Sequence, residues 1–219
     1  MLPVEPPVEP VPELLRLYRA REPWLEGRLV VTPHAGGLAI GGDGMLYIAG
    51  THTLFATPLA RAFDLGARFR QFPLGPGIIG GLAASTPDGI WLGTYENGPG
   101  RLFRFTAATL AQLSDGETLG ASQAASVLTI PDHAQGAAIG GGGLWIARSD
   151  WSWGTLDRLD PSTGAPQRRY DIAPGTEGIA FGSAGQLWAV SSAVRSRCRE
   201  AAAEPGELVE LPGVALLQC

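Results

Sequence analysis

The stretch Gly136-Ala137-Ala138-Ile139-Gly140-Gly141-Gly142-Gly143-Leu144-Trp145-Ile146-Ala147 decides the fold, because it reads as a short strand, a glycine turn and a second short strand. The pattern occurs four times, and the other copies start at Gly37, Gly81 and Gly178. Successive starting glycines, which we call the anchor glycines, are 44, 55 and 42 residues apart. A period of this length is typical of proteins built from one repeated supersecondary unit.

Each repeat contains two further short apolar segments. A third strand is predicted at residues 101–105 and 155–159, and a fourth at 69–72, 126–130 and 169–172. A four-stranded antiparallel sheet has two faces to cover, and stacking sheets around an axis covers both. We therefore predict an all-β fold, a β-propeller with about four complete four-stranded blades. Residues 15–19 and 28–31 add a leading half-blade, so the chain forms either a small ring or an arc of a larger propeller.

One aromatic residue stands at the same place in the second strand of every repeat: Tyr47, Trp91, Trp145 and Trp188. We interpret these side chains as packing between adjacent blades rather than as a ligand cage. The glycine turns at 41–44 and 140–143 are interpreted as hairpins that need positive φ. A phosphate loop is not expected there, because no helix follows and the chain has no lysine.

Length and composition fit a single domain. A chain of 219 residues with 45% apolar residues and 31 glycines can bury one core made of short strands and tight turns. The net charge of -5 argues against a nucleic-acid partner, because no basic stripe is present to bind a phosphate backbone. No run of 18 apolar residues is present, so no membrane span is expected.

The two ends of the chain differ from the repeats. Residues 1–12 are assigned to a proline-rich tail or linker, without the basic and apolar regions of a signal peptide, and residues 13–219 to the propeller domain. Cys198 and Cys219 would form a disulfide if the protein is exported, and would be two ordinary thiols in a reducing cytosol. Both compartments stay open, with an extracytoplasmic location slightly favoured.

Two phrases resemble the blades of NHL-type propellers. They are residues 176–181 followed by Gly185-Gln186-Leu187-Trp188, and Leu156-Asp157-Arg158-Leu159-Asp160-Pro161-Ser162-Thr163-Gly164. These sequences are most similar to those of the streptogramin lyase (virginiamycin B lyase) group, and the resemblance covers residues 13 to about 212. The resemblance implies six or seven blades, so another chain is one way to complete the ring. It also implies catalysis by a histidine with neighbouring glutamates and magnesium, but the matching strand ends, 147–150 and 189–192, contain no histidine.

Most polar and aromatic candidates fall on one face of the predicted propeller. This loop face carries the connections from the fourth strand of one blade to the first strand of the next, and from the second strand to the third. The opposite face carries turns that are mostly glycine. The residues expected to bind a ligand or partner are His34, His52, Tyr95, Glu96, His133, Asp150, Trp151, Trp153 and Glu177.

Two groups among these candidates have alternative interpretations. Trp151 and Trp153 form either a contact surface or a cap on the blade. His34 and His133 both lie three residues before an anchor glycine, and with Glu177 they could hold a divalent metal such as Mg²⁺ or Ca²⁺. Polar residues are common in exposed loops, and no HxH or HExxH spacing is present, so the ordinary polar loop is the favoured interpretation.

The sequence therefore predicts a non-enzymatic propeller module that needs no cofactor and uses its loop face to bind a protein or small ligand. The alternative is a metal-assisted lyase or lactonase, of the streptogramin lyase or gluconolactonase-like type, that uses His34, His133 and Glu177. A third possibility is a structural arc completed by another chain.

Overall fold

The computed structural model describes residues 35–62, 64, 67–150, 152–182, 185–191 and 214–216. The first blade contains β1 (Ala35–Ile40), β2 (Met45–Gly50), β3 (Thr53–Pro58) and β4 (Arg70–Pro73). The second contains β5 (Leu82–Thr86), β6 (Gly89–Gly93), β7 (Gly100–Thr106) and β8 (Ser126–Ile130), and the third contains β9 (Ala134–Gly140), β10 (Gly143–Ser149), β11 (Gly154–Leu159) and β12 (Pro166–Asp171). The fourth contains β13 (Thr176–Phe181), β14 (Leu187–Ser191) and β15 (Val214–Leu216).

The strands of each blade pair in chain order. The first three sheets are four-stranded and antiparallel throughout, which confirms the predicted all-β blade architecture. In the fourth sheet β13 and β14 are antiparallel, but β15 pairs parallel with β14, which the repeat does not predict. The proposed leading half-blade, the proline-rich tail, Cys198 and Cys219 lie outside the described residues.

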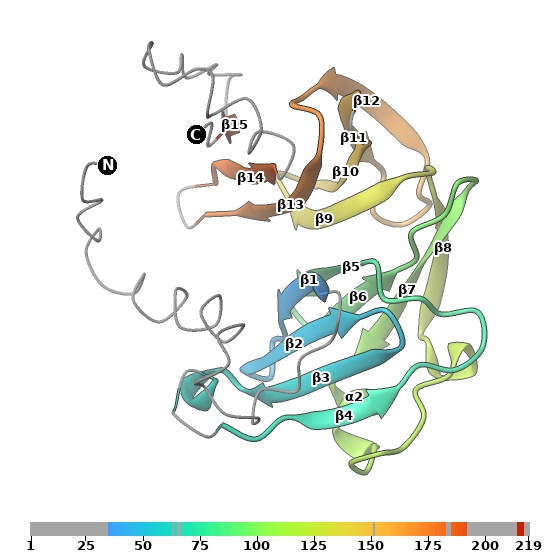
Figure 1. The fold of residues 1–219 in the computed structure, drawn as a ribbon, viewed down its shortest axis with the longest axis vertical. Coiled ribbons are helices and arrows are strands. Elements are labelled where there is room, and N and C mark those ends of the chain that lie inside the picture. Colours follow the sequence, from blue (N-terminus) through green and yellow to red (C-terminus); the bar gives the residue numbers. More distant parts are fainter. Residues whose placement is uncertain are drawn as a thin grey trace.

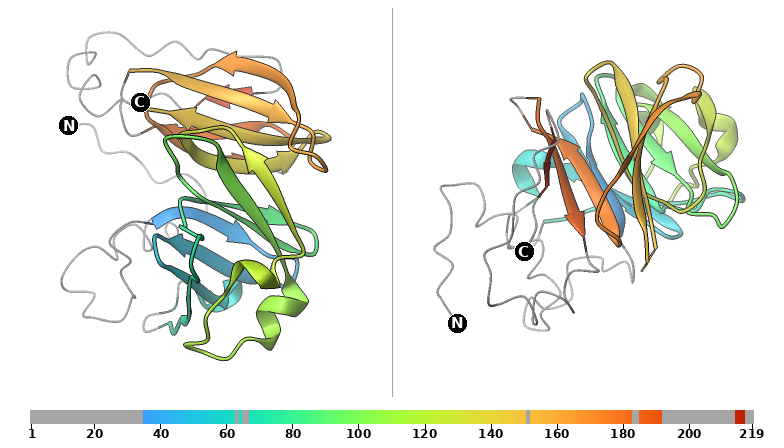
Figure 2. Two further views of the ribbon diagram at one scale, coloured as in Figure 1. Left: turned by 90° about the vertical axis from the view of Figure 1, so that its right-hand side faces the viewer. Right: turned by 90° about the horizontal axis from the view of Figure 1, so that it is seen from above.

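The four sheets pack on one another as an arc. The inner strands β1, β5, β9 and β13 lie side by side in that order, with the first and fourth blades at the two ends (Figures 1 and 2). The short helices lie between strands: η1 (Leu59–Arg61) follows β3, whereas α2 (Ala107–Gln112) and η2 (Ala121–Gln123) follow β7. None of the helices in the described ranges is long and apolar enough to cross a membrane.

The glycine turn between β9 and β10 is a two-residue hairpin. Gly140 pairs with Gly143, and the two residues between them, Gly141 and Gly142, have φ angles of 57° and 72°. Positive φ at both central positions gives the type I′ geometry whose twist matches antiparallel strands. The prediction of hairpin turns with positive φ is confirmed here.

The apolar core lies between the blades. Tyr47 packs in a cluster with Ile90 and Leu92 of the second blade, and Trp91 packs with residues of the third blade such as Leu144. Trp145 contacts Phe181 of the fourth blade edge to face, with 6.2 Å between ring centroids. The interpretation of the second-strand aromatic as a wedge between blades is confirmed at these three positions. Trp188 differs, because 39% of its surface is exposed.

Two anchor glycines have a role that the sequence interpretation missed. A Cβ atom on Gly37 would lie 2.3 Å from the amide nitrogen of Ala83, and one on Gly136 would lie 3.0 Å from the carbonyl oxygen of Glu177. Both neighbours belong to the next blade. These glycines therefore allow inner strands to approach closely, in addition to any part they play in the turns.

Candidate functional site

The loops of the loop face are joined from blade to blade by backbone hydrogen bonds. The amide of Gly80 donates to the carbonyl of Thr51 at 3.0 Å, that of His133 to Glu96 at 2.8 Å, and that of Gly175 to Asp150 at 2.9 Å. In each pair, the loop that enters one blade donates to the second-to-third-strand loop of the preceding blade. Because the pattern repeats at three junctions, these two kinds of loop share one face, as predicted.

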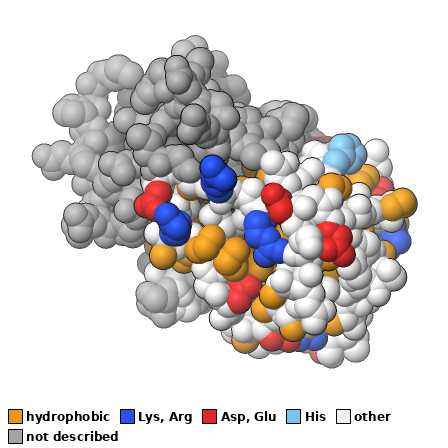
Figure 3. Space-filling model, turned by 90° about the horizontal axis from the view of Figure 1, so that it is seen from below, with side chains coloured by type: hydrophobic (Ala, Val, Ile, Leu, Met, Phe, Trp, Pro, Cys, Tyr) orange, Lys and Arg blue, Asp and Glu red, His pale blue; other side chains and the backbone are white. Residues whose placement is uncertain are grey.

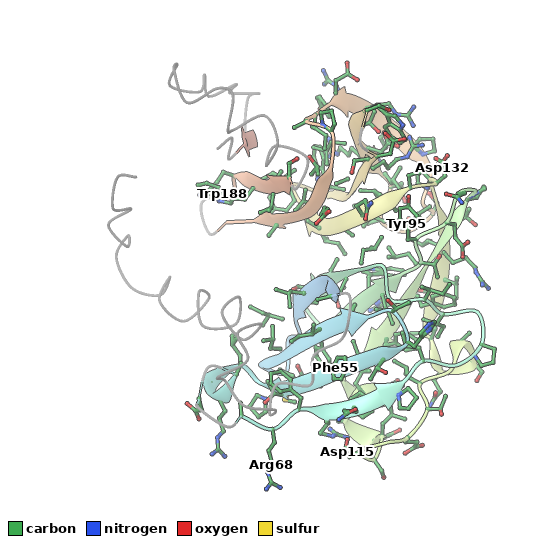
Figure 4. All side chains as sticks on the ribbon, viewed as in Figure 1. Phe55, Arg68, Tyr95, Asp115, Asp132 and Trp188 are labelled. Atoms are coloured by element: carbon green, nitrogen blue, oxygen red, sulfur yellow. The ribbon has the colours of Figure 1, made fainter. Side chains whose placement is uncertain are left out.

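An aromatic cluster forms where the second and third blades meet. Tyr95 comes from the β6–β7 loop, His133 from the β8–β9 loop and Trp153 from the β10–β11 loop. The ring of His133 lies 5.8 Å from that of Tyr95 and 5.6 Å from that of Trp153, both edge to face. We call these three residues the aromatic cluster; Figure 4 shows Tyr95 at this junction, near Asp132.

A buried arginine fixes the base of this cluster. The guanidinium of Arg148, on β10, lies 5.4 Å from the centre of the Trp153 ring. Its Nε donates to the carbonyl of Asp132 at 2.9 Å, and its terminal nitrogens form ion pairs with the carboxylates of Asp132 and Asp157. Arg148 is 9% exposed, so most of the charge is compensated by its partners within the fold.

Asp157 extends the network to the outer strand of the same blade. It is 2% exposed and accepts from Nε and a terminal nitrogen of Arg169 at 2.6 and 2.9 Å. The hydrogen bond and charge of Asp157 raise the pKa of Arg169, despite partial burial. The two arginines and the carboxylates of Asp132 and Asp157 form a charge-balanced unit, which holds the strands under the aromatic cluster in place.

The backbone of His133 is in an unusual conformation. Its φ angle is 53°, the only positive value at a non-glycine residue in the described part of the chain. Its Nδ1 lies 3.2 Å from Oδ2 of Asp132, but the described residues make no hydrogen bond to this buried nitrogen. Uncommon backbone conformations of this kind persist where surrounding contacts enforce them.

Hydrogen bonds keep two carboxylates of the site ionised. Burial acts to raise the pKa of Asp132, but the hydrogen bond and charge of Arg148 outweigh it and lower the pKa. Asp150 has a lowered pKa because its carboxylate accepts from the backbone amide and the hydroxyl of Ser152. The charge of Asp132 is balanced by Arg148, so the negative charge that the site presents is that of Asp150.

The remaining candidates are placed as follows. His52 is exposed in the β2–β3 loop, Glu96 is half-buried in the β6–β7 loop, and Glu177 is exposed on β13 rather than in a loop. His34 and Trp151 lie outside the described residues. Within the described ranges, no three His, Cys, Asp or Glu side chains gather closely enough to hold a metal ion, so those residues do not by themselves fit the suggested Mg²⁺ or Ca²⁺ site.

Sequence reasoning missed the most buried part of the site. Residues 147–150 were considered as a strand end without histidine. Arg148 and Ser149 end strand β10, and the hydroxyl of Ser149 donates to the carbonyl of Thr176 at 2.8 Å. Asp157 and Arg169 were considered only as parts of strands. The available signal was a charged residue, Arg148 or Asp157, inside each of two largely buried strands of one blade, which is costly unless the charges are paired.

Comparison with known proteins agrees on the fold. No family model matches the chain, and no curated protein sequence matches it. Among solved structures, hydrazine synthase of Kuenenia stuttgartiensis matches at a TM-score of 0.50 and 16% identity, covering 78% of this chain and 46% of that one. Glutaminyl cyclase of Myxococcus xanthus matches at a TM-score of 0.51 and 15% identity, covering 73% and 64%.

The fold is that of a β-propeller. The chain spans between about half and two thirds of the two solved chains that it matches. At these identities the likeness concerns the fold alone, and a fold does not by itself specify a function.

Proposed function

We propose that the chain is a non-enzymatic binding module whose loop face takes a protein or small ligand at the aromatic cluster. The observation that carries the proposal is the convergence of Tyr95, His133 and Trp153 from three separate loops. Loops held on a rigid scaffold are the usual place for binding residues. Here two adjacent blades provide that scaffold.

The physical chemistry of the cluster suits recognition. Tyr95 is 36% exposed and Trp153 is half-buried, so both rings keep surface that a ligand can cover. Aromatic side chains concentrate binding energy at such sites, because they bury a large area and lose few rotamers. The network of Arg148 with Asp132 and Asp157 is already formed without a ligand, which lowers the ordering cost of binding.

The proposal can be tested by nuclear magnetic resonance of the tryptophan indole N–H groups. The protein is titrated with a panel of amino acids, sugars, nucleotides and short peptides, and the Trp153 signal is assigned from the spectrum of Trp153→Phe. Binding at the cluster should shift that signal, and Tyr95→Ala should weaken the same titration about tenfold or more.

A matched control is Val127→Ala, because Val127 is 47% exposed on β8, an outer strand. This variant should bind like the parent protein. If every ligand that binds leaves the Trp153 signal unmoved, or if Tyr95→Ala binds with parental affinity, the loop face is not the binding surface.

The second candidate is the metal-assisted lyase or lactonase suggested by the resemblance to streptogramin lyases. It is favoured by the positive φ of His133 and by its buried Nδ1 without a hydrogen bond, because strained residues are often found at active sites. Its test is the metal content of protein purified without chelators, for the parent chain and for a His34→Ala, His133→Ala double variant. Absence of Mg²⁺ and Ca²⁺ from both would remove this candidate.

A further inference from the structure

The closed junction between the third and fourth blades has two complementary sides. The third blade contributes the wedge face, formed by Gly136 and Ala138 on β9 and by Trp145 and Ala147 on β10. The fourth blade contributes the receiving face, formed by Ile179, Phe181, Leu187 and Ala189. Ala147 is fully buried and Ala138 is 6% exposed. The contact is apolar and close, as Gly136 against β13 requires.

The fourth blade presents a second wedge face with no partner among the described residues. Gly178 and Ala180 on β13 face the same way as Trp188 and Val190 on β14, because Gly178 pairs with Val190 and Ala180 with Trp188. Val190 is 58% exposed and Trp188 39%. No described residue lies within 4 Å of a Cβ atom on Gly178, whereas the equivalent atom on Gly136 meets the next blade.

The first blade presents a receiving face that is only partly covered: Leu46 is 4% exposed, whereas Leu38 and Ile40 belong to none of the apolar clusters of the described residues. Leu38 and Ile40 on β1 pair with Ile48 and Leu46 on β2, as Ala137 and Ile139 pair with Ile146 and Leu144 in the third blade. Ala137 and Ile139 pack against the second blade. Leu38 and Ile40 are instead 50% and 47% exposed. The arc therefore ends in a wedge face on the fourth blade and in the exposed inner-strand part of a receiving face on the first blade. Figure 1 shows these two blades at the ends of the arc.

We infer that the wedge face of one copy docks on the receiving face of a second copy, so that this chain associates head to tail. Both faces occur in every molecule, and they are the two halves of a contact that the chain already forms within itself. Trp188 of one copy would lie over Leu38 and Ile40 of the other, with Gly178 against the partner's inner strand. Such a heterologous contact either closes a ring or adds further copies.

The inference is tested with two variants that place the same charge on opposite faces, Trp188→Glu and Leu38→Glu, in the full chain. Molar mass is measured by sedimentation velocity over a wide concentration range. The parent protein should exceed the 22.9 kDa of one copy at high concentration, and each variant alone should stay monomeric. An equimolar mixture of the two should regain dimer, because one of its contacts then joins two unaltered faces.

Two further variants separate docking from misfolding. Gly178→Val adds bulk where no described residue lies within 4 Å, so the folded monomer should melt like the parent while the dimer is lost. Val127→Glu, a charge at a similarly exposed apolar site on β8, should leave the association unchanged. A parent protein that is monomeric throughout overturns the inference, as does a mixture that fails to recombine or a dimer that only Trp188→Glu disrupts.

Discussion

The repeated strand–turn–strand segment has different surroundings in the third and fourth blades. Its copy in the third blade packs against one face of the fourth blade, and its copy in the fourth blade forms the opposite face, which is exposed. On the closed side, Trp145 of the third blade donates from Nε1 to the carbonyl of Gly140 at 2.9 Å, and its ring packs with Tyr170 and Phe181. On the open side, the equivalent Trp188 is 39% exposed, and Val190 is more exposed still. The comparison teaches that a blade repeat encodes a contact surface, whereas burial of that surface depends on what stands next to it.

The largest expected difference between the two sides comes from the tryptophans. Trp145→Ala should lower the free energy of unfolding by up to about 3 kcal/mol, the lower end of the cost of removing a core aromatic, because the ring is only partly buried. Trp188→Ala should cost far less in dilute solution, because much of that ring stays in contact with water. Urea unfolding followed by circular dichroism measures both, and equal losses would mean that the open face is covered in the monomer.

The ionic network is expected to have an effect of similar size. Arg148→Met should destabilise the chain by about 1–3 kcal/mol, because the buried Asp157 loses one of its two arginine partners but keeps Arg169. Ser191 takes the place of Arg148 in the fourth blade, one residue beyond Val190. The control is Arg168→Met on the exposed outer strand β12, and comparable thermal shifts for the two variants would contradict a structural role for Arg148.

Substitution of the anchor glycines Gly136 and Gly178 should change the free energy of unfolding by moderately different amounts. Gly136→Val places bulk 3.0 to 3.2 Å from backbone atoms of β13 and should cost about 1–3 kcal/mol. Gly178→Val in the dilute monomer should be neutral or slightly stabilising, because valine favours a strand and no described residue lies within 4 Å of the added Cβ atom. Melting temperatures of the two variants check this, and a loss at Gly178 as large as that at Gly136 would be inconsistent with an open face.

The smallest expected effect is that of acid on the ion pair between Asp132 and Arg148, at the junction of the second and third blades. The folded-state pKa of Asp132 lies below its unfolded value of about 3.9, so its contribution is complete above that pH and is lost as pH falls through the lower folded value. The parent protein should therefore lose more stability than Asp132→Asn on acidification from pH 5 to about pH 3. Parallel stability curves for the two proteins would show that Asp132 makes no such contribution.

The surface shows no single dominant field in the view of Figure 3, where arginine, acidic and hydrophobic side chains are interspersed over the visible described residues.

Much of the fold follows from local sequence. The spacing of the anchor glycines predicts the blade number, and the alternation in segments such as 155–159 predicts the strands, because strand periodicity and hairpin chemistry are properties of a few adjacent residues. Strand β3 was missed, since residues 53–58 have buried side chains in succession and no alternating pattern. The sequence also predicts which loops share a face, because the alternating direction of antiparallel strands determines on which side of the sheet each connecting loop lies.

By itself, the sequence determined the blade, its glycine turns and the loops that carry Tyr95, His133 and Trp153. Only the tertiary structure decided that these three rings meet, that Arg148 lies between Asp132 and Asp157, and that Trp188 is exposed where Trp145 is packed. The physical reason is distance along the chain. Turns and strands depend on neighbours in sequence, whereas ion pairs and blade junctions depend on residues that only the packing of separate blades brings together.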